Sequence, residues 1–330
     1  MAVEFGPETL ADVDAGLRAL LPEWDFSPQA SLSLLNVSEN ATYRVDEAGQ
    51  SLVIRVHRTH YHQPHEIASE LAWIQSLRQD GLVETPAPRH GKAGALVHEV
   101  ACAQGPYRHA VAFDFVPGKE PQADADTVPW FKTLGRVTAL MHQQSRQWSK
   151  PAGFARKTWD YDAMFGTQCY WGRWQEGVGL DEAGRALMGR ALNLIERRLA
   201  SFGRTADRFG LIHADLRLAN LLVDDDRLRV IDFDDCGFSW HLYDFAAAIS
   251  FFEHDPIVSD LQEAWVEGYR TVAPLAAEDV AELPVFIAMR RFLLVAWIAS
   301  HPEVPIAQEL GASYTAGALE IAEALLSKFS

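Results

Sequence analysis

Cysteine is scarce in this chain of 330 residues, and the three that occur, Cys102, Cys169 and Cys236, show no CxxC spacing. An odd count without close pairs predicts no complete disulfide framework. A reducing compartment suits such a sequence, so we expect a cytoplasmic protein. The N-terminal segment is acidic and lacks a basic stretch followed by an apolar core, so it predicts no secretory signal peptide.

Positive charge is also scarce, because 29 Lys and Arg residues stand against 45 Asp and Glu residues, for a net charge of −16. Such a field repels phosphate backbones, which argues against a nucleic-acid partner and is compatible with a cationic one. Solubility is the plainer explanation of the acidic excess.

Long apolar runs are missing too. The most apolar stretch, residues 286–300, contains Arg290 and Arg291 and is too short to cross a bilayer, so it predicts a buried helix and no membrane span.

The first 115 residues are patterned mainly for β structure, with a hairpin turn expected at residues 47–50. Apolar residues at helical spacing predict one helix over residues 65–77. The segment Val116-Pro117-Gly118 then breaks the pattern as a hinge would. The expected strands are 31–37 (SLSLLNV), 41–47 (ATYRVDE), 51–57 (SLVIRVH), 95–101 and 107–115.

Residues 116–330 are patterned mainly for helix, except for a short β insertion at residues 221–233 that turns at three consecutive aspartates. The sequence thus predicts an α+β fold of two lobes, a β-rich N-lobe of residues 1–115 and a mainly helical C-lobe of residues 116–330. Because clefts form between lobes, we expect the chemistry there. The expected helices are 126–147, 181–203, 240–252, 257–272, 277–301 and 306–328.

The strongest chemical signal is the segment LIHADLRLAN, which contains His213, Asp215 and Asn220, followed by VIDFDD with Asp232. An apolar strand that ends in acidic residues places carboxylates at a buried rim, where a divalent cation can be held. Phosphoryl transfer needs such groups, since a base must orient the acceptor hydroxyl and oxygen ligands must hold magnesium. An acidic β turn without catalysis is the alternative, but the combined spacing is specific.

These segments resemble the aminoglycoside phosphotransferase/choline kinase superfamily, relatives of the protein kinases, over roughly residues 30–300. The resemblance implies a protein-kinase-like fold and an ATP-dependent phosphotransferase with ATP and Mg2+ as cofactors. It implies that Asp215 is the catalytic base, with His213 in the structural position beside it. It also implies that Asn220 and Asp232 are the magnesium ligands.

One position departs from the family. The segment VIRV stands where the family has a strand lysine paired to a helix glutamate, and no lysine precedes Lys92. Arg55 is therefore the candidate on that strand, because its guanidinium can fork onto phosphate oxygens. Glu70 is the expected partner, with Glu66 one turn earlier as the alternative. An exposed arginine and a solvated glutamate without any ligand would be the plain alternative.

The loop between the first two strands lacks the GxGxxG of protein kinases. It would have to hold phosphates through backbone N–H groups and the side chains of Ser38 and Asn40, and a plain hairpin loop is the alternative. The resemblance puts the adenine near residues 113–116, so Phe113 and Phe115 are further candidates for nucleotide binding.

The order of HADLRLANLLV, IDFDDCGF and YDFAAAISFFEHDP, with LGRVTALMH earlier, is similar to a bacterial branch of the superfamily. That branch includes type II homoserine kinases and stress-response Ser/Thr kinases. The resemblance implies that Asp244, in the YDFA segment, braces the catalytic loop.

Other features bear on the acceptor. Asp234 and Asp235 follow the metal-ligand position and are expected to face the acceptor, where they could pair with an ammonium group or simply be solvated or cap a loop. The aromatic residues at 159–161 and 170–174 could enclose a cation, and a small satellite core is the alternative. Four histidines between residues 57 and 65 lack the spacing of a metal site.

Three acceptor classes stay open: an amino alcohol or aminoglycoside, homoserine or a similar hydroxy amino acid, and protein serine or threonine. A nucleotide-binding regulator without catalysis is a further alternative, which Arg55 keeps open. The joint presence of Asp215, Asn220 and Asp232 argues against it. The expected partners are ATP and a hydroxyl-bearing acceptor, without nucleic acid or membrane, and the sequence specifies no oligomeric state.

Overall fold

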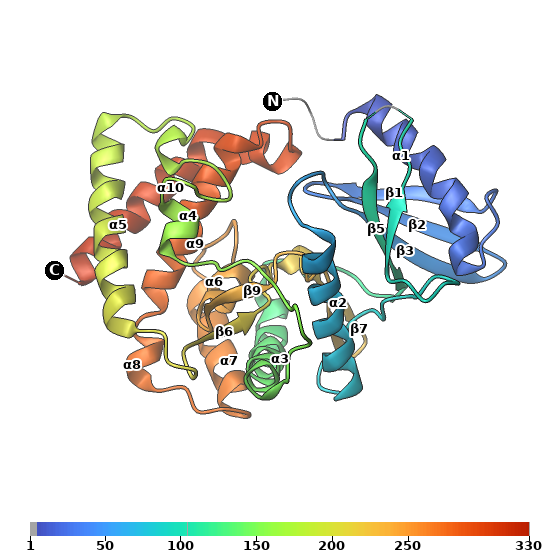
Figure 1. The fold of residues 1–330 in the computed structure, drawn as a ribbon. Coiled ribbons are helices and arrows are strands. Elements are labelled where there is room, and N and C mark those ends of the chain that lie inside the picture. The colour runs from blue at the N-terminus through green and yellow to red at the C-terminus, as the bar shows by residue number, and fades with distance from the viewer. Residues whose placement is uncertain (1–4, 104, 330) are drawn as a thin grey trace. The chain divides into compact units, whose positions relative to one another are not determined.

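The computed structural model describes residues 5–103 and 105–329, and the chain divides into two compact units. The first unit comprises residues 1–118 and 149–156, and the second comprises residues 119–148 and 157–330. Residues 1–4, which begin the segment expected to lack a signal peptide, lie outside the described residues. The first unit contains a β-sheet and the second is mostly helical (Figure 1).

The sheet of the first unit is antiparallel and five-stranded, with the strand order β1-β2-β3-β5-β4. The turn between β2 and β3 has positive φ at Ala48 (51°) and Gly49 (80°), as a two-residue type I′ hairpin requires. The hairpin predicted at residues 47–50 is thereby confirmed. The elements of this unit are α1 (Pro7–Leu20), η1 (Leu21–Trp24), β1 (Ser31–Val37), β2 (Ala41–Glu47), β3 (Gln50–Val56), α2 (Pro64–Gln79), β4 (Val97–Val100) and β5 (Arg108–Asp114).

Alternation along β3 separates the two faces of this sheet. Ile54 is buried in the same apolar core as Val13 and Leu17 of α1. Because successive strand side chains point to opposite faces, Arg55 points away from that core, and there it meets Glu70 of α2. Helix α1 was not expected from the sequence, and it closes the apolar face of the sheet. The alternation therefore places the buried side chain of Arg55 on the face of the sheet opposite that apolar core.

Residues 149–156 belong to the first unit because hydrogen bonds tie them to α2. The N–H of Ala155 donates to Ser69 Oγ at 3.0 Å, and Arg156 Nη1 donates to the backbone oxygen of Glu66 at 3.0 Å. The Glu66 carboxylate accepts from the N–H of Gln63 at 2.8 Å, which closes a capping box at the start of α2.

In the second unit, α9 is apolar on all sides and is buried almost throughout, as the sequence predicted. The span Ala277–Ser300 is long and apolar enough to cross a membrane, but 78% of its most apolar window is buried inside the protein, as in the core helix of a globular fold. The helices of this unit are η2 (Ala125–Thr127), α3 (Val128–Gln147), α4 (Tyr161–Phe165), η3 (Trp174–Glu176), α5 (Glu182–Phe202), η4 (Leu218–Asn220), α6 (Tyr243–Ala248), α7 (Val258–Arg270), α8 (Ala277–Val280), α9 (Leu283–Ser300) and α10 (Pro305–Lys328, kinked at Gly311).

Helices α3 and α7 approach closely because each has a glycine at the crossing. A Cβ on Gly135 would lie 2.0 Å from the backbone oxygen of Trp265, and a Cβ on Gly268 would lie 1.8 Å from that of Lys132. A larger residue at either position would force the helices apart. This contact fixes α3, which carries His142 towards the catalytic loop.

Two pairs of short strands hold the functional loops. The predicted β insertion is confirmed as β7 (Leu221–Asp224) and β8 (Arg227–Val230). A second pair, β6 (Phe209–Ile212) with β9 (Gly237–Trp240), was not predicted. Unlike β7 and β8, these short strands are not joined by a turn that marks a hairpin, and their pairing is decided by tertiary contacts. The helix predicted at 240–252 is correspondingly too long, because Trp240 belongs to β9 and the observed helix α6 ends at Ala248.

Buried histidines in the second unit predict how stability depends on pH. The rings of His142 and His241 stack with centroids 4.4 Å apart, and burial lowers the pKa of each to about 3. The unfolded chain therefore binds protons that the folded chain does not, and stability falls as the pH falls below about 6.5. Asp244 has the opposite effect on stability near pH 6. Burial raises its pKa to about 6, so there the folded chain binds a proton that the unfolded chain does not.

We expect the free energy of unfolding to decrease by about 1 kcal/mol between pH 7.5 and pH 6.0. The His241→Asn variant should show a weaker pH dependence, because one of the buried rings that stay neutral in the folded chain is gone. Denaturant titrations at the two pH values measure both quantities. An unchanged pH dependence in the variant would show that His241 is not held neutral.

Candidate active site

The catalytic loop follows β6 and contains a strained residue. Ala214 has φ 67°, a left-handed conformation that is costly without glycine. Asp244, in the first turn of α6, holds this backbone in place: Oδ1 accepts from the N–H of Ala214 at 2.7 Å and Oδ2 from that of His213 at 3.3 Å. The contact that the predicted bracing role of Asp244 requires is therefore present.

A second layer of polar contacts supports Asp244. Its Oδ2 lies 2.9 Å from Nε2 of His142, whose Nδ1 lies 3.1 Å from the Tyr269 hydroxyl. Because burial lowers the pKa of His142 to about 3, this ring is neutral at pH 7. We assign its proton to Nε2, which then donates to the ionised carboxylate while Nδ1 accepts from Tyr269. Tyr269, His142 and Asp244 thus form a continuous series of hydrogen bonds within the protein.

The carboxylate of Asp215 is held by two cations and an amide. Arg290 Nη2 donates to Oδ1 at 2.6 Å, Asn220 Nδ2 donates to Oδ2 at 2.8 Å, and Arg217 Nε lies 3.3 Å from Oδ2. Burial by itself would raise the pKa of Asp215, but the charges of Arg290 and Arg217 outweigh it and hold the pKa below its ordinary value. Asp215 is therefore ionised at neutral pH and can accept a hydrogen bond from a hydroxyl group.

His213 connects the loop to the strand that precedes the second motif. Its Nε2 lies 3.1 Å from the backbone oxygen of Ile231, its Nδ1 accepts from the N–H of Asp215 at 3.3 Å, and its ring lies 4.5 Å from that of Phe233. Burial lowers its pKa. A buried, neutral imidazole with these partners positions the backbone of Asp215.

The predicted metal ligands, Asn220 and Asp232, lie at neighbouring points of the two motifs. The N–H of Ile231 donates to the backbone oxygen of Asn220 at 2.9 Å, which puts Asp232 in the next position. Because Asn220 Nδ2 faces Asp215, its side-chain oxygen faces away and is the atom able to bind a cation. Asp232 is exposed and has φ 58°.

These two side chains offer one amide oxygen and one carboxylate, which are hard ligands suited to Mg2+. Within residues 5–103 and 105–329 no group of three or more His, Cys, Asp and Glu side chains could hold a metal. A cation at Asn220 and Asp232 would therefore complete its coordination with phosphate and water oxygens, and the donor set fits such a site.

The acidic pair and the aromatic insert contact each other. The backbone oxygen of Asp235 accepts from Trp159 Nε1 at 2.7 Å, and the Trp159 ring lies 5.1 Å from that of Trp171. Both tryptophans are buried, so they form the satellite core considered above, whereas Tyr170 is 40% exposed. Asp234 is buried, and its N–H approaches Asp232 Oδ1 at 3.4 Å.

Sequence reasoning missed Arg217 and Arg290 as contacts of Asp215. Arg217 lies inside the motif, two residues after Asp215, and its charge was the available signal. Arg290 lies on α9, 75 residues away along the chain. A charge inside an apolar run was the only trace of it in the sequence, and it could not indicate the partner.

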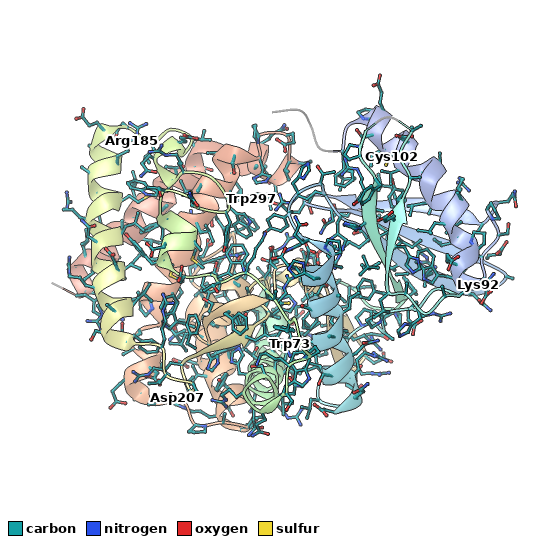
Figure 2. All side chains as sticks on the ribbon, in the orientation of Figure 1. Trp73, Lys92, Cys102, Arg185, Asp207 and Trp297 are labelled. Carbon is teal, nitrogen blue, oxygen red and sulfur yellow. The ribbon has the colours of Figure 1, made fainter. Side chains whose placement is uncertain are left out.

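In the first unit, the predicted pairing of Arg55 with Glu70 is confirmed. Arg55 Nη2 lies 2.8 Å from Oε1 and 2.7 Å from Oε2 of Glu70, with side-chain exposures of 5% and 0%. The alternative partner, Glu66, instead caps α2. Lys92, the first lysine of the chain, is exposed in the loop before β4, far from β3 in sequence (Figure 2). The role of Arg55 in binding nucleotide stays a prediction.

The other candidates of the first unit surround the same sheet. Asn40 is buried, and its Oδ1 accepts from the N–H of Arg58 at 3.2 Å, while the N–H of Ser38 donates to the backbone oxygen of Asn40 at 3.1 Å. The guanidinium of Arg55 lies 5.6 Å from the ring of Phe113, and that of Arg44 lies 4.2 Å from the ring of Phe115. These contacts give the loop after β1 and the end of β5 a defined shape, and nucleotide binding there stays a prediction.

A double variant separates the structural and functional roles of Arg55. Arg55→Met leaves the buried Glu70 without its counter-ion, so we expect a loss of about 3–5 kcal/mol in unfolding free energy. Arg55→Met with Glu70→Leu should recover most of that loss but keep a KM for ATP raised at least about tenfold, since charged hydrogen bonds contribute about 1.5–3 kcal/mol. A normal KM for ATP in the stable double variant would show that Arg55 is structural only.

Three comparisons with known proteins bear on this site. Residues 33–275 match the family model described as "Phosphotransferase enzyme family". The structure of a microcompartment-associated aminopropanol kinase is similar, with 47% identity, a TM-score of 0.88, and coverage of 94% of this chain and 97% of that one. A structure of an amicoumacin kinase with AMP-PNP, Ca2+ and Ami has 20% identity and a TM-score of 0.76, over 97% of this chain and 96% of that one.

Among curated proteins, a homoserine kinase of Rhizobium etli is 25% identical over 288 residues, which cover 84% of this chain and 83% of the relative's length. The fold is therefore protein-kinase-like, of the α+β class predicted from the sequence, with an antiparallel sheet in the first unit and mostly helices in the second.

Proposed function

The chain belongs to the phosphotransferase enzyme family, and from that premise we propose that it transfers the γ-phosphate of ATP to the hydroxyl group of a small amino alcohol. It is a kinase that acts on the hydroxyl group of a small molecule. The observation that carries the amino-alcohol assignment is the 47% identity to an aminopropanol kinase over 94% of this chain.

The charges of the second unit also support an amino alcohol over a hydroxy amino acid. Asp234 and Asp235 follow the metal-ligand position directly and place negative charge beside it, which would favour an ammonium group on the acceptor. The two buried arginines of α9 are each paired with an acid of this chain, Asp215 and Glu253, so neither is available to bind a carboxylate on the acceptor. The relative that acts on homoserine is also less similar, at 25% identity.

In the proposed reaction, Asp215 accepts a hydrogen bond from the acceptor hydroxyl and orients its oxygen towards the γ-phosphorus. The new oxygen–phosphorus bond forms as the bond from the γ-phosphorus to the bridging oxygen breaks, and ADP leaves with that electron pair. The hydroxyl proton passes to Asp215 and then to solvent. Arg217 contacts Oδ2, the other oxygen of the carboxylate, and its charge helps to keep Asp215 ionised before the proton arrives.

The cofactor is ATP with a divalent metal, which we propose to be Mg2+ held by Asn220 and Asp232. When bound, it neutralises the charge that develops on the phosphate oxygens. In the first unit, Arg55, Ser38 and Asn40 are the proposed phosphate contacts, and Phe113 and Phe115 are the proposed contacts of the nucleoside.

Acceptor-dependent release of ADP tests the proposal. We would assay the enzyme with Mg-ATP and, in turn, 1-amino-2-propanol, ethanolamine, homoserine, an aminoglycoside and a generic protein substrate. The matched control is 2-propanol, which keeps the hydroxyl group and lacks the amine. We expect stimulation by the amino alcohols and none by 2-propanol. Stimulation by homoserine or protein alone would reject the amino-alcohol assignment and leave the reaction class in place.

A further inference from the structure

Two consecutive arginines lie in the buried interior of α9 and have different kinds of partner. Arg291 Nη1 lies 2.6 Å from Glu253 Oε2, and its Nη2 donates to the backbone oxygen of Tyr314 at 2.8 Å. Arg290 pairs instead with Asp215. Burying a guanidinium is costly, and apolar residues often serve the stability of a core equally well. The pairing of Arg290 with the catalytic carboxylate therefore calls for an explanation other than stability.

The guanidinium of Arg290 is fixed by contacts at all three nitrogens. Nε donates to Ser250 Oγ at 2.9 Å, Nη1 lies 3.3 Å from the Tyr243 hydroxyl, and Nη2 donates to Asp215 Oδ1 at 2.6 Å. The indole of Trp171 lies 5.3 Å from its central carbon. Because the group is planar, three fixed nitrogens leave it no freedom to rotate, so the direction of the bond to Asp215 is set.

The partners of Asp215 leave one direction for a substrate. A carboxylate offers about four hydrogen-bonding directions, two on each oxygen. Asn220 and Arg217 take both directions on Oδ2, and Arg290 takes one direction on Oδ1, among the residues that the structure describes. The side chain of Asp215 is 15% exposed, and the one direction without a described partner lies on Oδ1.

We propose that Arg290 is a positioning residue for the catalytic base: it holds the Asp215 carboxylate so that the open direction of Oδ1 meets the acceptor hydroxyl. This inference deepens the proposed function and rests on Asp215 being the base of that reaction. Misplacing a catalytic group by about 1 Å can cost about 100-fold in rate, so the rigid attachment has a direct effect on turnover.

The test compares variants at Arg290 with a matched control at Arg291, and it uses whichever acceptor gives wild-type enzyme its highest rate. We expect Arg290→Met to lower kcat about 100-fold, with the KM for ATP within about twofold of wild type. Arg290→Lys keeps the positive charge but lacks the planar guanidinium group, and we expect kcat to decrease by about tenfold. Arg291→Met removes an equally buried arginine that does not touch Asp215, and its kcat should stay within about threefold of wild type.

Thermal unfolding of each variant is measured alongside, and all rates are taken well below the unfolding midpoints. A kcat for Arg290→Met within about threefold of wild type would overturn the proposal, as would equal losses in the Arg290→Met and Arg291→Met variants. If Arg290→Met does not fold, the lysine variant decides, and an unchanged kcat there rejects the proposal. Failure of the proposed function is seen separately, as a wild-type enzyme that phosphorylates no amino alcohol.

Discussion

Asp215→Asn is expected to lower kcat by about 100- to 10,000-fold while leaving the affinity for ATP within about threefold of wild type. The asparagine cannot take the proton of the acceptor hydroxyl. It also lacks the negative charge that Arg290 and Arg217 contact in the wild-type protein. ADP release under saturating acceptor gives kcat, and calorimetric titration with a non-hydrolysable ATP analogue gives the affinity.

Asp226→Asn, in the exposed turn between β7 and β8, is the control for the loss of one negative charge, and its kcat should equal that of wild type. Because Arg290 loses its counter-ion in Asp215→Asn, folding is checked by thermal unfolding before rates are compared. A well-folded Asp215→Asn enzyme with more than a tenth of the wild-type kcat would refute the assignment of Asp215 as the base.

Asp244→Asn is expected to have the second largest effect, on stability and turnover together. The carboxylate of Asp244 accepts from the backbone N–H groups of His213 and Ala214 and from His142. An asparagine amide places N–H groups against at least one of these donors inside a buried site. We expect a loss of about 3 kcal/mol in unfolding free energy, in the range for a broken buried network.

Turnover should also decrease, because the left-handed backbone at Ala214 depends on Asp244 and relaxes without it. Denaturant unfolding measures the first effect and ADP release at low temperature measures the second. Asp260→Asn, exposed in the first turn of α7, is the control, and only a few tenths of a kcal/mol are expected there. A loss below about 1 kcal/mol in Asp244→Asn would show that the network does not hold the loop.

Local sequence signals predicted the parts of the structure that local physics determines. The alternating strands β1 to β3, their type I′ turn and the amphipathic helix α2 each have enough residues for the pattern to be read. The pairing of Arg55 with Glu70 followed because strand and helix periodicity both point the side chains to one place. The loop from His213 to Asn220 was recognised because its residues are contiguous.

What the sequence did not predict depends on contacts between distant segments. The strands β6 and β9 each have four residues, and only their mutual pairing makes them strands. Arg290 reaches Asp215 from a helix whose pattern indicates only burial, so its partner could not be inferred from spacing. The surroundings of the catalytic carboxylate were therefore the least predictable part of the site.

The central claim is that this enzyme makes a phosphate ester of an amino alcohol, and 31P NMR of the reaction products tests it most directly. With Mg-ATP and 1-amino-2-propanol, we expect a phosphomonoester resonance coupled to the carbinol proton of the acceptor, growing in proportion to ADP. The resonance should be absent with 2-propanol and with the Asp215→Asn enzyme. Formation of ADP and inorganic phosphate alone, or a new ester only when homoserine is supplied, would contradict the account.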